Sequence, residues 1–353
     1  MDHLAIETDG NNVLLQSYLE LKTKNPRLFA RDAARQLGIS EGELLASRCG
    51  RDAVRLDGNW HELVGALSTL GRVMCLTRND CAVHERKGSY VDVRVREHTG
   101  AAIGPELDLR YDFRHWHFGF VLTDVTEQGT RESLQIFDID GTAVHKIYKT
   151  EETSEKAWTR LVAERRAEDQ SAGQKVMPRE SRPEEASDAS IDVEGLRQAW
   201  RGMKNTHQFP AMLRTYGVSR PQCFRLAGAE FAEKLGPDAI QLTLKGANAN
   251  GLTLMIFVVN PGATQIHTGV PGNLKQTGDW FNVLDPDFNL HLLIKGIQSA
   301  WIVRKRYDLG TSRSIEAYDE DGEPILWIFG KRNADGTEPE AWRDFVESLP
   351  VNG

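Results

Sequence analysis

The spacing of apolar positions in this chain changes from a helical period to a strand period, and the change occurs twice. Near the start, residues 11–24, 28–37 and 41–48 carry apolar side chains three and four positions apart, which predicts helices. Another helix is predicted at 60–71, and a last one closes the first half at 154–166. Between these two, short apolar runs alternate with polar residues, which predicts a meandering antiparallel sheet.

Turn-forming Gly, Asp and Asn residues bound the predicted strands. Asp140-Gly141 is a hairpin signal between the last two of them. The strand runs are VMCLTR, SYVDVRV, HFGFVLT, LQIFDI and AVHKIY.

In the second half, the stretch from Met203 to Arg220 predicts an amphipathic helix that begins with a histidine. Thr206 is the expected N-cap, and Pro210 disfavours a regular helix much before it, so His207 should lie in the first turn. Gly217 should end the helix. An imidazole here could ligate a metal centre, although a cap or a buried structural histidine is the commoner role. The apolar stripe behind it consists of Phe209, Met212, Leu213 and Tyr216.

The second half repeats the first. LGIS at 37–40 returns as YGVS at 216–219, and SLQIFDIDG at 133–141 returns as SIEAYDEDG at 314–322, about 180 residues later. Ala157-Trp158 likewise returns as Ala341-Trp342. These matches predict a tandem duplication of α+β class, each half combining helices with a large antiparallel sheet.

The halves are separated by a segment without aromatic residues that is rich in Glu, Ser, Ala and Pro, which predicts a flexible linker. The expected organisation is therefore an N-terminal repeat at 1–166, a linker at 167–192 and a C-terminal repeat at 193–353. His207 aligns with about Arg27, so this imidazole is specific to the second half, where a duplicated scaffold could have acquired a ligand.

Composition narrows the function. The 353 residues are 40% apolar and 27% charged, with a net charge of −8, which argues against a surface that coats nucleic acid. No apolar run approaches the ~20 residues of a membrane span, so stable membrane insertion is not expected. The polar, acidic N-terminus resembles no secretion signal, and the four cysteines lack metal-site spacing. Together these features favour the cytoplasm.

No Walker loop, GxGxxG, HExxH or nucleophile elbow is present. His115 and His117 would share one face of a strand, with Trp116 on the other, but a pair without a third ligand is a weak zinc site. His145 is expected to be structural.

Three features of the second half nevertheless combine. They are the histidine at the helix start, the half-buried apolar strand 254–258, and nearby cations at Arg214, Arg220, Arg304 and Lys305. A flat apolar ligand that carries a metal and carboxylates would use all three. Haem is such a ligand, because its iron takes an axial imidazole and its propionates pair with Arg or Lys.

Motifs spread from about residue 13 to residue 348 strengthen this interpretation. In order and content they resemble the cytoplasmic hemin-degrading and hemin-transport proteins of Gram-negative bacteria, the HemS/ChuS/HmuS/PhuS type. The resemblance implies a duplicated α+β protein that binds haem b between the sheet and the helices of the C-terminal half. The motifs are NPRLFARDAARQLGISEGEL, TRNDCAVHERKG, LDLRYDF, AWRGMKNTHQFPAMLRTYGVSR, MIFVVNPGATQIHTG, FNLHLL, AWIVRK and AWRDFV.

The same resemblance implies roles for single residues. His207 in THQF corresponds to the proximal ligand of the haem iron, and Arg110 in LDLR to a catalytic arginine on the distal side. The other implied haem-binding residues are Arg220 and Lys305 near the propionates, Met255 and Phe257 along the porphyrin, and His84, a ligand for a second haem in some members. A structural place in a sheet is the alternative for His84.

This chain departs from the family pattern at three places. HQFP stands for the commoner HQFF, RHWH for NQW, and His267 for an aromatic residue. The roles of His115, His117, His267 and His291 are therefore left open.

The resemblance implies a haem-binding protein of haem uptake and iron acquisition that degrades haem oxidatively with electrons from a reductase. The alternative is a non-catalytic chaperone that takes haem from an inner-membrane importer and passes it to a separate haem oxygenase. Haem-regulated DNA binding is a third option, which the acidic charge does not support. Whether the protein is a monomer or a homodimer is left open.

Overall fold

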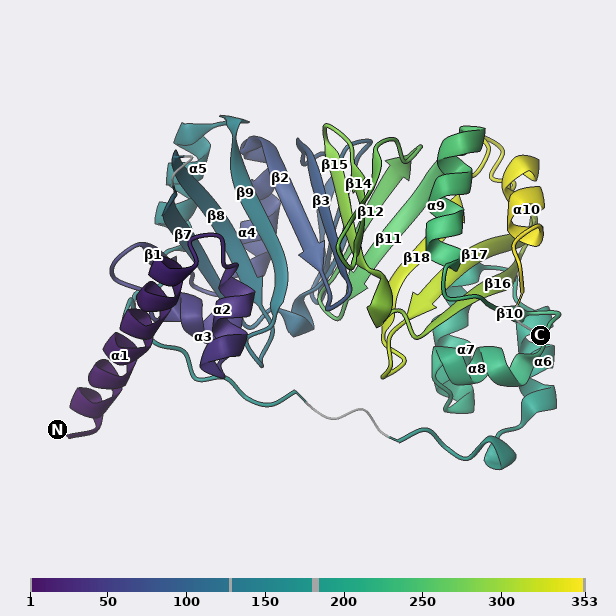
Figure 1. The fold of residues 1–353 in the computed structure, drawn as a ribbon, viewed down its shortest axis with the longest axis horizontal. Helices are drawn as coiled ribbons and strands as arrows, with labels where there is room; N and C mark the ends of the chain where they lie inside the picture. The colour runs from purple at the N-terminus through teal and green to yellow at the C-terminus, as the bar shows by residue number, and fades with distance from the viewer. Residues whose placement is uncertain (1, 127–128, 180–183, 352–353) are drawn as a thin grey trace. The chain divides into compact units, whose positions relative to one another are not determined.

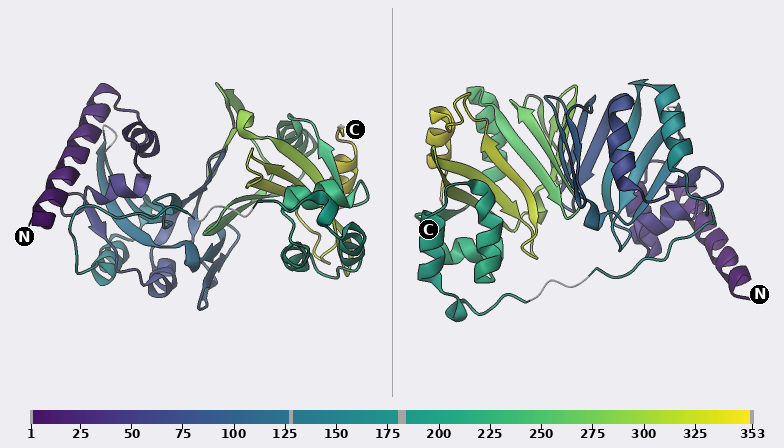
Figure 2. Two further views of the ribbon diagram at one scale, coloured as in Figure 1. Left: turned by 90° about the horizontal axis from the view of Figure 1, so that it is seen from below. Right: turned by 180° about the vertical axis from the view of Figure 1, so that it is seen from behind.

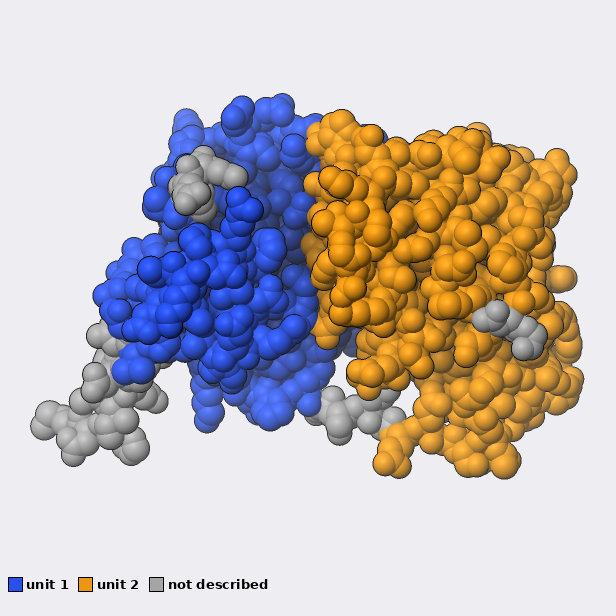
Figure 3. Space-filling view, in the orientation of Figure 1, with its two compact units in different colours: residues 1–78, 85–180, 260–265 blue, residues 79–84, 181–259, 266–353 orange. Residues whose placement is uncertain are grey.

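The computed structural model describes residues 2–126, 129–179 and 184–351. The chain forms two compact units, coloured separately in Figure 3. Each half of the chain contributes one short segment to the unit formed mainly by the other half. Unit 1 contains Met1–Arg78, Glu85–Glu180 and Asn260–Gln265, and unit 2 contains Asn79–His84, Ser181–Val259 and Ile266–Gly353.

The first half of the chain builds most of unit 1. Its helices are α1 (Asp2–Lys24), α2 (Ala30–Leu37), α3 (Glu41–Ala46), α4 (Trp60–Ala66) and α5 (Glu155–Arg165), with the 3-10 helices η1 (Leu67–Thr69) and η2 (Phe113–His115). Its strands are β1 (Ala53–Arg55), β2 (Gly71–Arg78), β3 (Ala82–Ser89), β4 (Val93–Val95), β5 (Thr99–Ile103), β6 (Asp108–Asp112), β7 (Phe118–Thr126), β8 (Gly129–Phe137) and β9 (Ala143–Thr153).

In unit 1 a first run of neighbouring antiparallel strands has the order β1-β7-β8-β9-β2. A second antiparallel run consists of β4, β5 and β6. Helices α1–α3 lie on one face of the first run, and α4 and α5 lie on the other (Figures 1 and 2). The burial pattern explains this arrangement. Val73 and Cys75 pack with α4 and α5, whereas Phe120 and Leu122 pack with α3.

The second half builds most of unit 2. Its helices are η3 (Asp188–Ser190), α6 (Val193–Arg201), η4 (Thr206–Gln208), α7 (Phe209–Tyr216), α8 (Arg220–Ala227), α9 (Ala239–Asn250), η5 (Ile294–Gly296) and α10 (Glu340–Glu347). Its strands are β10 (Ala232–Leu235), β11 (Leu254–Asn260), β12 (Ala263–Gly269), β13 (Leu274–Thr277), β14 (Trp280–Leu284), β15 (Phe288–Leu293), β16 (Ser299–Tyr307), β17 (Gly310–Tyr318) and β18 (Pro324–Gly330).

Unit 2 repeats the plan of unit 1, which confirms the predicted duplication and the α+β class. Its strand order β10-β16-β17-β18-β11 matches the first run of unit 1, and β13-β14-β15 match the second. The buried side chains of Leu254 and Ile256 face a core shared with α9 and α10. The buried residues of α6–α8 pack instead with Val303 and Tyr318, so helices cover both faces of this run as well.

Local signals predict several element ends correctly. Ser40 and Glu43 form the capping box of α3, and Gly38 ends α2 with a positive φ of 70°. The predicted Asp140-Gly141 turn joins β8 to β9. The predicted strand SYVDVRV, residues 89–95, is wrong in its extent. Its first residue, Ser89, ends β3 (Ala82–Ser89), and only Val93–Val95 form β4.

Two equivalent asparagines hold the exchanged segments. In unit 2, the side-chain amide of Asn79 donates to the carbonyls of Val259 (3.0 Å) and Ile325 (2.8 Å). Its carbonyl accepts the backbone N–H groups of Cys81 (3.0 Å) and Ala82 (2.8 Å). The side chain thus shapes the turn that carries residues 79–84 into this unit.

Asn260 makes the corresponding four bonds in unit 1. Its amide donates to the carbonyls of Arg78 (2.9 Å) and Val144 (2.8 Å). Its carbonyl accepts from Gly262 (3.1 Å) and Ala263 (2.8 Å). The duplication therefore extends to individual hydrogen bonds.

The described parts of the predicted linker bond to the two units. Gly173 and Ser171 accept from Arg55 of unit 1, the latter at 3.1 Å. Further along, Asp188 accepts from Arg225 of unit 2 at 2.9 Å. The remaining linker residues 180–183 lie outside the described residues. Among the helices that the structure describes, none is long and apolar enough to cross a membrane.

Candidate functional site

An aromatic strip lies on the face of the unit 2 sheet that is turned away from α9. Met255 pairs in register with Phe329, and Phe257 with Trp327, so the four side chains share one face. All four are half-buried, whereas the alternating Ile256 is fully buried in the core. The ring of Phe257 lies 5.2 Å from that of Phe329 and 6.5 Å from that of Trp327. The ring of Phe257 is inclined by 66° to that of Phe329 and by 41° to that of Trp327, so the strip is an apolar surface of tilted rings.

A fully buried carboxylate stands beside the strip. Glu316 on β17 pairs in register with Trp327. Its Oε1 accepts from the ammonium of Lys305 and from Ser314 Oγ (2.9 Å). Its Oε2 accepts from Arg220 Nη1 (2.8 Å) and from Tyr318 OH (2.5 Å). Four donors therefore satisfy both oxygens of one carboxylate.

The charges of this cluster stabilise one another. Burial raises the pKa of Glu316, but Lys305 and Arg220 lower it more, to about 2. Burial lowers the pKa of Arg220, but the attraction of Glu316 outweighs burial and leaves it raised. For Lys305, burial dominates and lowers the pKa despite Glu316. Two cations face one anion, so the cluster keeps a positive charge beside the aromatic strip.

Phe209 connects this cluster to the histidine segment. Its ring centroid lies 4.8 Å from Lys305 Nζ and 5.2 Å from the guanidinium carbon of Arg220. The ring is fully buried and packs on Trp200 at 4.8 Å. Since His207 is only two residues earlier, the packing of Phe209 fixes the position of the backbone that carries the imidazole.

His207 is exposed, and the structure corrects its predicted setting. The α-helix begins at Phe209, and His207 lies in the preceding 3-10 turn η4 rather than in the first α-helical turn. The N-cap is Asn205, not Thr206: Asn205 Oδ1 accepts the backbone N–H of His207 at 2.9 Å. Gln208 Oε1 accepts from Asn205 N at 3.1 Å, which completes a capping box. The imidazole itself is left available to a ligand from outside.

The duplicated first half has a different set at the matching positions. Gln135 pairs in register with Lys146, as Glu316 does with Trp327, and Met74 pairs with Tyr148, as Met255 does with Phe329. Lys146 is buried and forms an ion pair with Glu41. The aromatic strip and its two cations are thus a feature of unit 2.

Arg110 lies on β6 in unit 1. Its guanidinium forms an ion pair with Asp108 and donates to the carbonyl of Leu109 at 2.9 Å, and its side chain is 44% exposed. Its counterpart in the duplicated half is His291 on β15, whose Nδ1 contacts Asn282 Oδ1 at 2.7 Å. The catalytic role of Arg110 stays a prediction.

His84 lies in a packed aromatic cluster of unit 2. Its ring is 5.0 Å from that of Phe288 and 6.5 Å from that of His267. His267 stacks on Phe288 with centroids 3.6 Å apart and an angle of 5°. His84 is fully buried, so a second haem at this residue would require the cluster to open.

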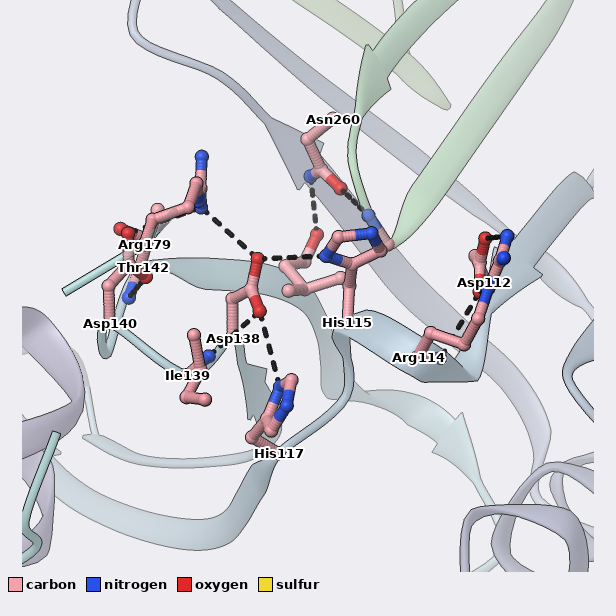
Figure 4. A network of polar contacts seen from close by, with 12 residues as sticks. Asp112, Arg114, His115, His117, Asp138, Ile139, Asp140, Thr142, Arg179 and Asn260 are labelled. Carbon is pink, nitrogen blue, oxygen red and sulfur yellow. Dashed lines mark hydrogen bonds and ion pairs between the residues drawn. The ribbon is translucent and has the colours of Figure 1, made fainter. Parts of the chain in front are cut away.

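His115 and His117 converge on one buried carboxylate in unit 1 (Figure 4). Their Nδ1 atoms each lie 3.2 Å from an oxygen of Asp138, which Arg179 also contacts at 3.2 Å. The predicted strand is wrong, because η2 ends at His115, but Trp116 does point elsewhere and donates to the carbonyl of Gly262 at 2.9 Å. In the described part of the chain, no three His, Cys, Asp or Glu side chains are arranged to hold a metal.

The residues that organise the unit 2 site are not evident from the sequence. In the sequence, Glu316 and Tyr318 are notable only as part of the repeat. Nothing in the sequence distinguishes Trp327 and Phe329. The available signal is the alternation of Ser314, Glu316 and Tyr318 with Ile315 and Ala317 in a buried strand. It points to a site because a buried carboxylate needs cationic partners.

Comparison with known proteins gives a consistent result. Residues 38–164 and 217–349 match the model of the haemin-degrading HemS.ChuX domain. Hemin transport protein HmuS of Yersinia pestis is 36% identical over 342 residues, covering 96% of this chain and 98% of the relative.

Two solved structures are similar over nearly the whole chain. The heme-binding protein PhuS from Pseudomonas aeruginosa, in its holo form, has a TM-score of 0.94 and 43% identity, covering 97% of this chain and 99% of that one. The heme-degrading enzyme ChuS from Escherichia coli O157:H7 has a TM-score of 0.89 and 33% identity, covering 96% and 99%.

Proposed function

The chain belongs to the haemin-degrading HemS.ChuX family, and from this premise we propose that unit 2 binds haem and that the protein degrades it oxidatively to release iron. One observation carries the haem assignment. An exposed imidazole, a half-buried aromatic strip, the buried Lys305 and the half-buried Arg220 are linked through Phe209 and Glu316 within one unit.

Each part suits one part of haem. His207 as a neutral imidazole would ligate the iron through a ring nitrogen. Met255 and Phe257 would cover the porphyrin, whose apolar face would pack on the strip. Arg220 and Lys305 would hold the two propionates by charge-assisted hydrogen bonds.

The residues of the chain bind and orient the substrate, whereas bound haem supplies both the redox-active iron and the carbon that is oxidised. His207 would hold the iron from one side. Arg110 would donate a hydrogen bond to the negative charge that develops during oxidation, and its own positive charge would stabilise that negative charge. Molecular oxygen would be the oxidant, and an external reductase would supply the electrons that its activation requires.

A non-catalytic chaperone is the second candidate. The Yersinia pestis relative is named a hemin transport protein, which favours transfer of intact haem to a separate haem oxygenase. The same imidazole, strip and cations would serve that function. Turnover therefore separates the two candidates, and binding does not.

The test is single-turnover oxidation of the haem complex with a physiological reductase, in the presence of catalase. Catalase removes free peroxide, so only oxidation within the complex counts. Loss of the Soret band with release of iron and a linear tetrapyrrole supports degradation. Retention of intact haem, followed by its transfer to an added haem oxygenase, supports the chaperone. If the protein takes up no haem, both candidates are wrong.

A further inference from the structure

We infer that Glu316 is the positioning residue that makes this site selective for porphyrins with free carboxylates. The inference rests on the proposed function and deepens it, because it concerns the ligand class of the same site. Glu316 would not touch the ligand. It would act through Arg220 and Lys305, whose positions and charges depend on it.

The first argument is geometric. Both cations converge on one carboxylate, with Lys305 Nζ on Oε1 and Arg220 Nη1 on Oε2 at 2.8 Å. Ser314 and Tyr318 donate to the same two oxygens, at 2.9 Å and 2.5 Å, and fix the carboxylate from its own strand. Since Glu316 accepts from all four, its rotation is blocked and the spacing of the two cations is set.

The second argument concerns the donors that remain. The guanidinium of Arg220 has five N–H groups, and Glu316 accepts from Nη1. Its central carbon lies 4.3 Å from the ring centroid of Trp327 and 5.2 Å from that of Phe209, so the two rings hold the guanidinium against the aromatic strip. A porphyrin on the strip would therefore present its carboxylates to an oriented guanidinium.

The third argument is the charge balance. Lys305 and Glu316 are almost completely buried, and a buried ammonium without a carboxylate partner is costly. Without the negative charge of Glu316, Lys305 and Arg220 would repel each other, and Lys305 would turn away or lose its proton. Either change removes a positive charge that a ligand carboxylate needs.

The duplicated half provides an internal comparison. Gln135 stands at the position of Glu316, and its neighbour in register is Lys146 instead of Trp327. There Lys146 pairs with Glu41, so its charge is already neutralised within unit 1. Unit 1 thus lacks the carboxylate that joins two cations, although two of its four matching strip positions keep a methionine, Met74, and an aromatic ring, Tyr148.

The test compares two ligands that differ only in charge, haem and its dimethyl ester, by titration of the Soret band at pH 7. Wild type should bind haem more tightly than the ester. In Glu316→Gln the ratio of the two affinities should fall by about tenfold or more, because haem loses its charged contacts and the ester has none to lose. A merely structural role would weaken both ligands alike and leave the ratio unchanged.

Glu338→Gln is the matched control. Glu338 is also a largely buried glutamate of unit 2 and pairs with Arg313 Nη1 at 2.5 Å, away from the strip. Its replacement should not change the ratio. Tyr318→Phe is a milder variant in case Glu316→Gln does not fold. It removes one donor to Glu316 and should lower the ratio about twofold to threefold.

The outcomes separate this inference from the proposed function. If wild type prefers haem and both Glu316→Gln and Tyr318→Phe keep that preference, the role of Glu316 is wrong while haem binding stands. If the ratio rises in Glu316→Gln, the added positive charge matters more than position, which also overturns the inference. If wild type binds neither ligand, the proposed function itself fails.

Discussion

Single residues of this protein differ in how visible their roles are in the sequence. His207 stands out there because it has no histidine counterpart in the duplicated half and starts an apolar stripe. Glu316 lies in a strand whose pattern indicates only alternation, and its importance arises from partners such as Arg220, 96 residues away. At this scale, unusual residues can be found from sequence, whereas interaction hubs cannot.

Replacing His207 by alanine should weaken haem binding about tenfold or more and abolish the imidazole-type Soret spectrum, because the iron loses its ligand. A hemin titration of both proteins measures this. His98→Ala is the control, since His98 is another exposed histidine, 62% accessible, far along the chain in unit 1. Identical spectra and affinities for wild type and His207→Ala would remove His207 from the site.

Replacing Arg110 by alanine should leave haem bound but slow its oxidation about tenfold or more, because a donor to the developing negative charge is lost. The rate of Soret loss with reductase and catalase measures this. Arg94→Ala is matched to it, because Arg94 also forms an ion pair with an aspartate two residues before it in unit 1. Equal rates in the two variants would show that Arg110 has no catalytic part.

At the scale of elements, β2, β6 and β9 enclose a buried polar cluster. His145 Nδ1 contacts Thr77 Oγ1 at 2.9 Å, and its Nε2 contacts the hydroxyls of Tyr111 (3.2 Å) and Tyr90 (3.4 Å). The structural role expected for His145 fits this setting. Burial lowers the pKa of His145 to about 3, so the folded protein keeps this imidazole neutral.

This pKa predicts a pH dependence of stability. The unfolded chain protonates His145 near pH 6.5 and the folded chain only near pH 3, so the free energy of unfolding should fall as the pH drops through this range. The slope from this one group is at most about 1.4 kcal/mol per pH unit. Urea unfolding between pH 7 and pH 4.5 should show a weaker dependence in His145→Gln. An unchanged slope would mean that His145 is protonated in the folded state.

The exchanged segments also make a prediction at this scale. Asn79→Ala and Asn260→Ala should each lower the free energy of unfolding by about 2 kcal/mol or more, because each removes at least four hydrogen bonds to backbone groups. Chemical denaturation measures both. Asn333→Ala, in an exposed turn, should change stability by less than about 0.5 kcal/mol. An equally small effect at Asn79 would show that the turn forms without its side chain.

At the scale of the whole molecule, the two duplicated units share one arrangement of strands but differ in the side chains on the matching sheet face. The strand orders and the two asparagine turns are shared, whereas the aromatic strip and its cations belong to unit 2. In unit 1 the matching face carries the Glu41–Lys146 ion pair. The shared features maintain the fold, and the differences are where we place the function.

The exchange predicts that the isolated C-terminal half, residues 193–353, does not form the native unit 2. It lacks Cys81 and Ala82, which belong to the buried core of that unit, and Leu293 loses a 2.8 Å hydrogen bond to the carbonyl of Cys81. The near-ultraviolet circular dichroism spectrum of the isolated half should lack the signal of fixed tertiary packing. On heating, the isolated half should show no cooperative transition. Adding residues 1–192 should restore both signals. A cooperative transition of the isolated half would contradict this.

Much of this organisation was determined by the sequence alone. The helical and strand periods, the glycines that end α2 and α7, the cap at Ser40 and the repeat were all predictable. They depend on residues within a few positions of one another, or on similarity between distant segments that needs no contact. The resemblance of the motifs also pointed to the family that the comparisons show.

Only the tertiary structure decided how the site is built and how the halves share their segments. It showed that Asn205, not Thr206, caps the histidine turn, that Glu316 joins Arg220 to Lys305, and that each half contributes a segment to the other unit. These features join residues far apart in the chain. A buried carboxylate destabilises the fold when it has no cationic partner, and it can join several cations when the fold brings them close. No local sequence pattern shows which of the two applies.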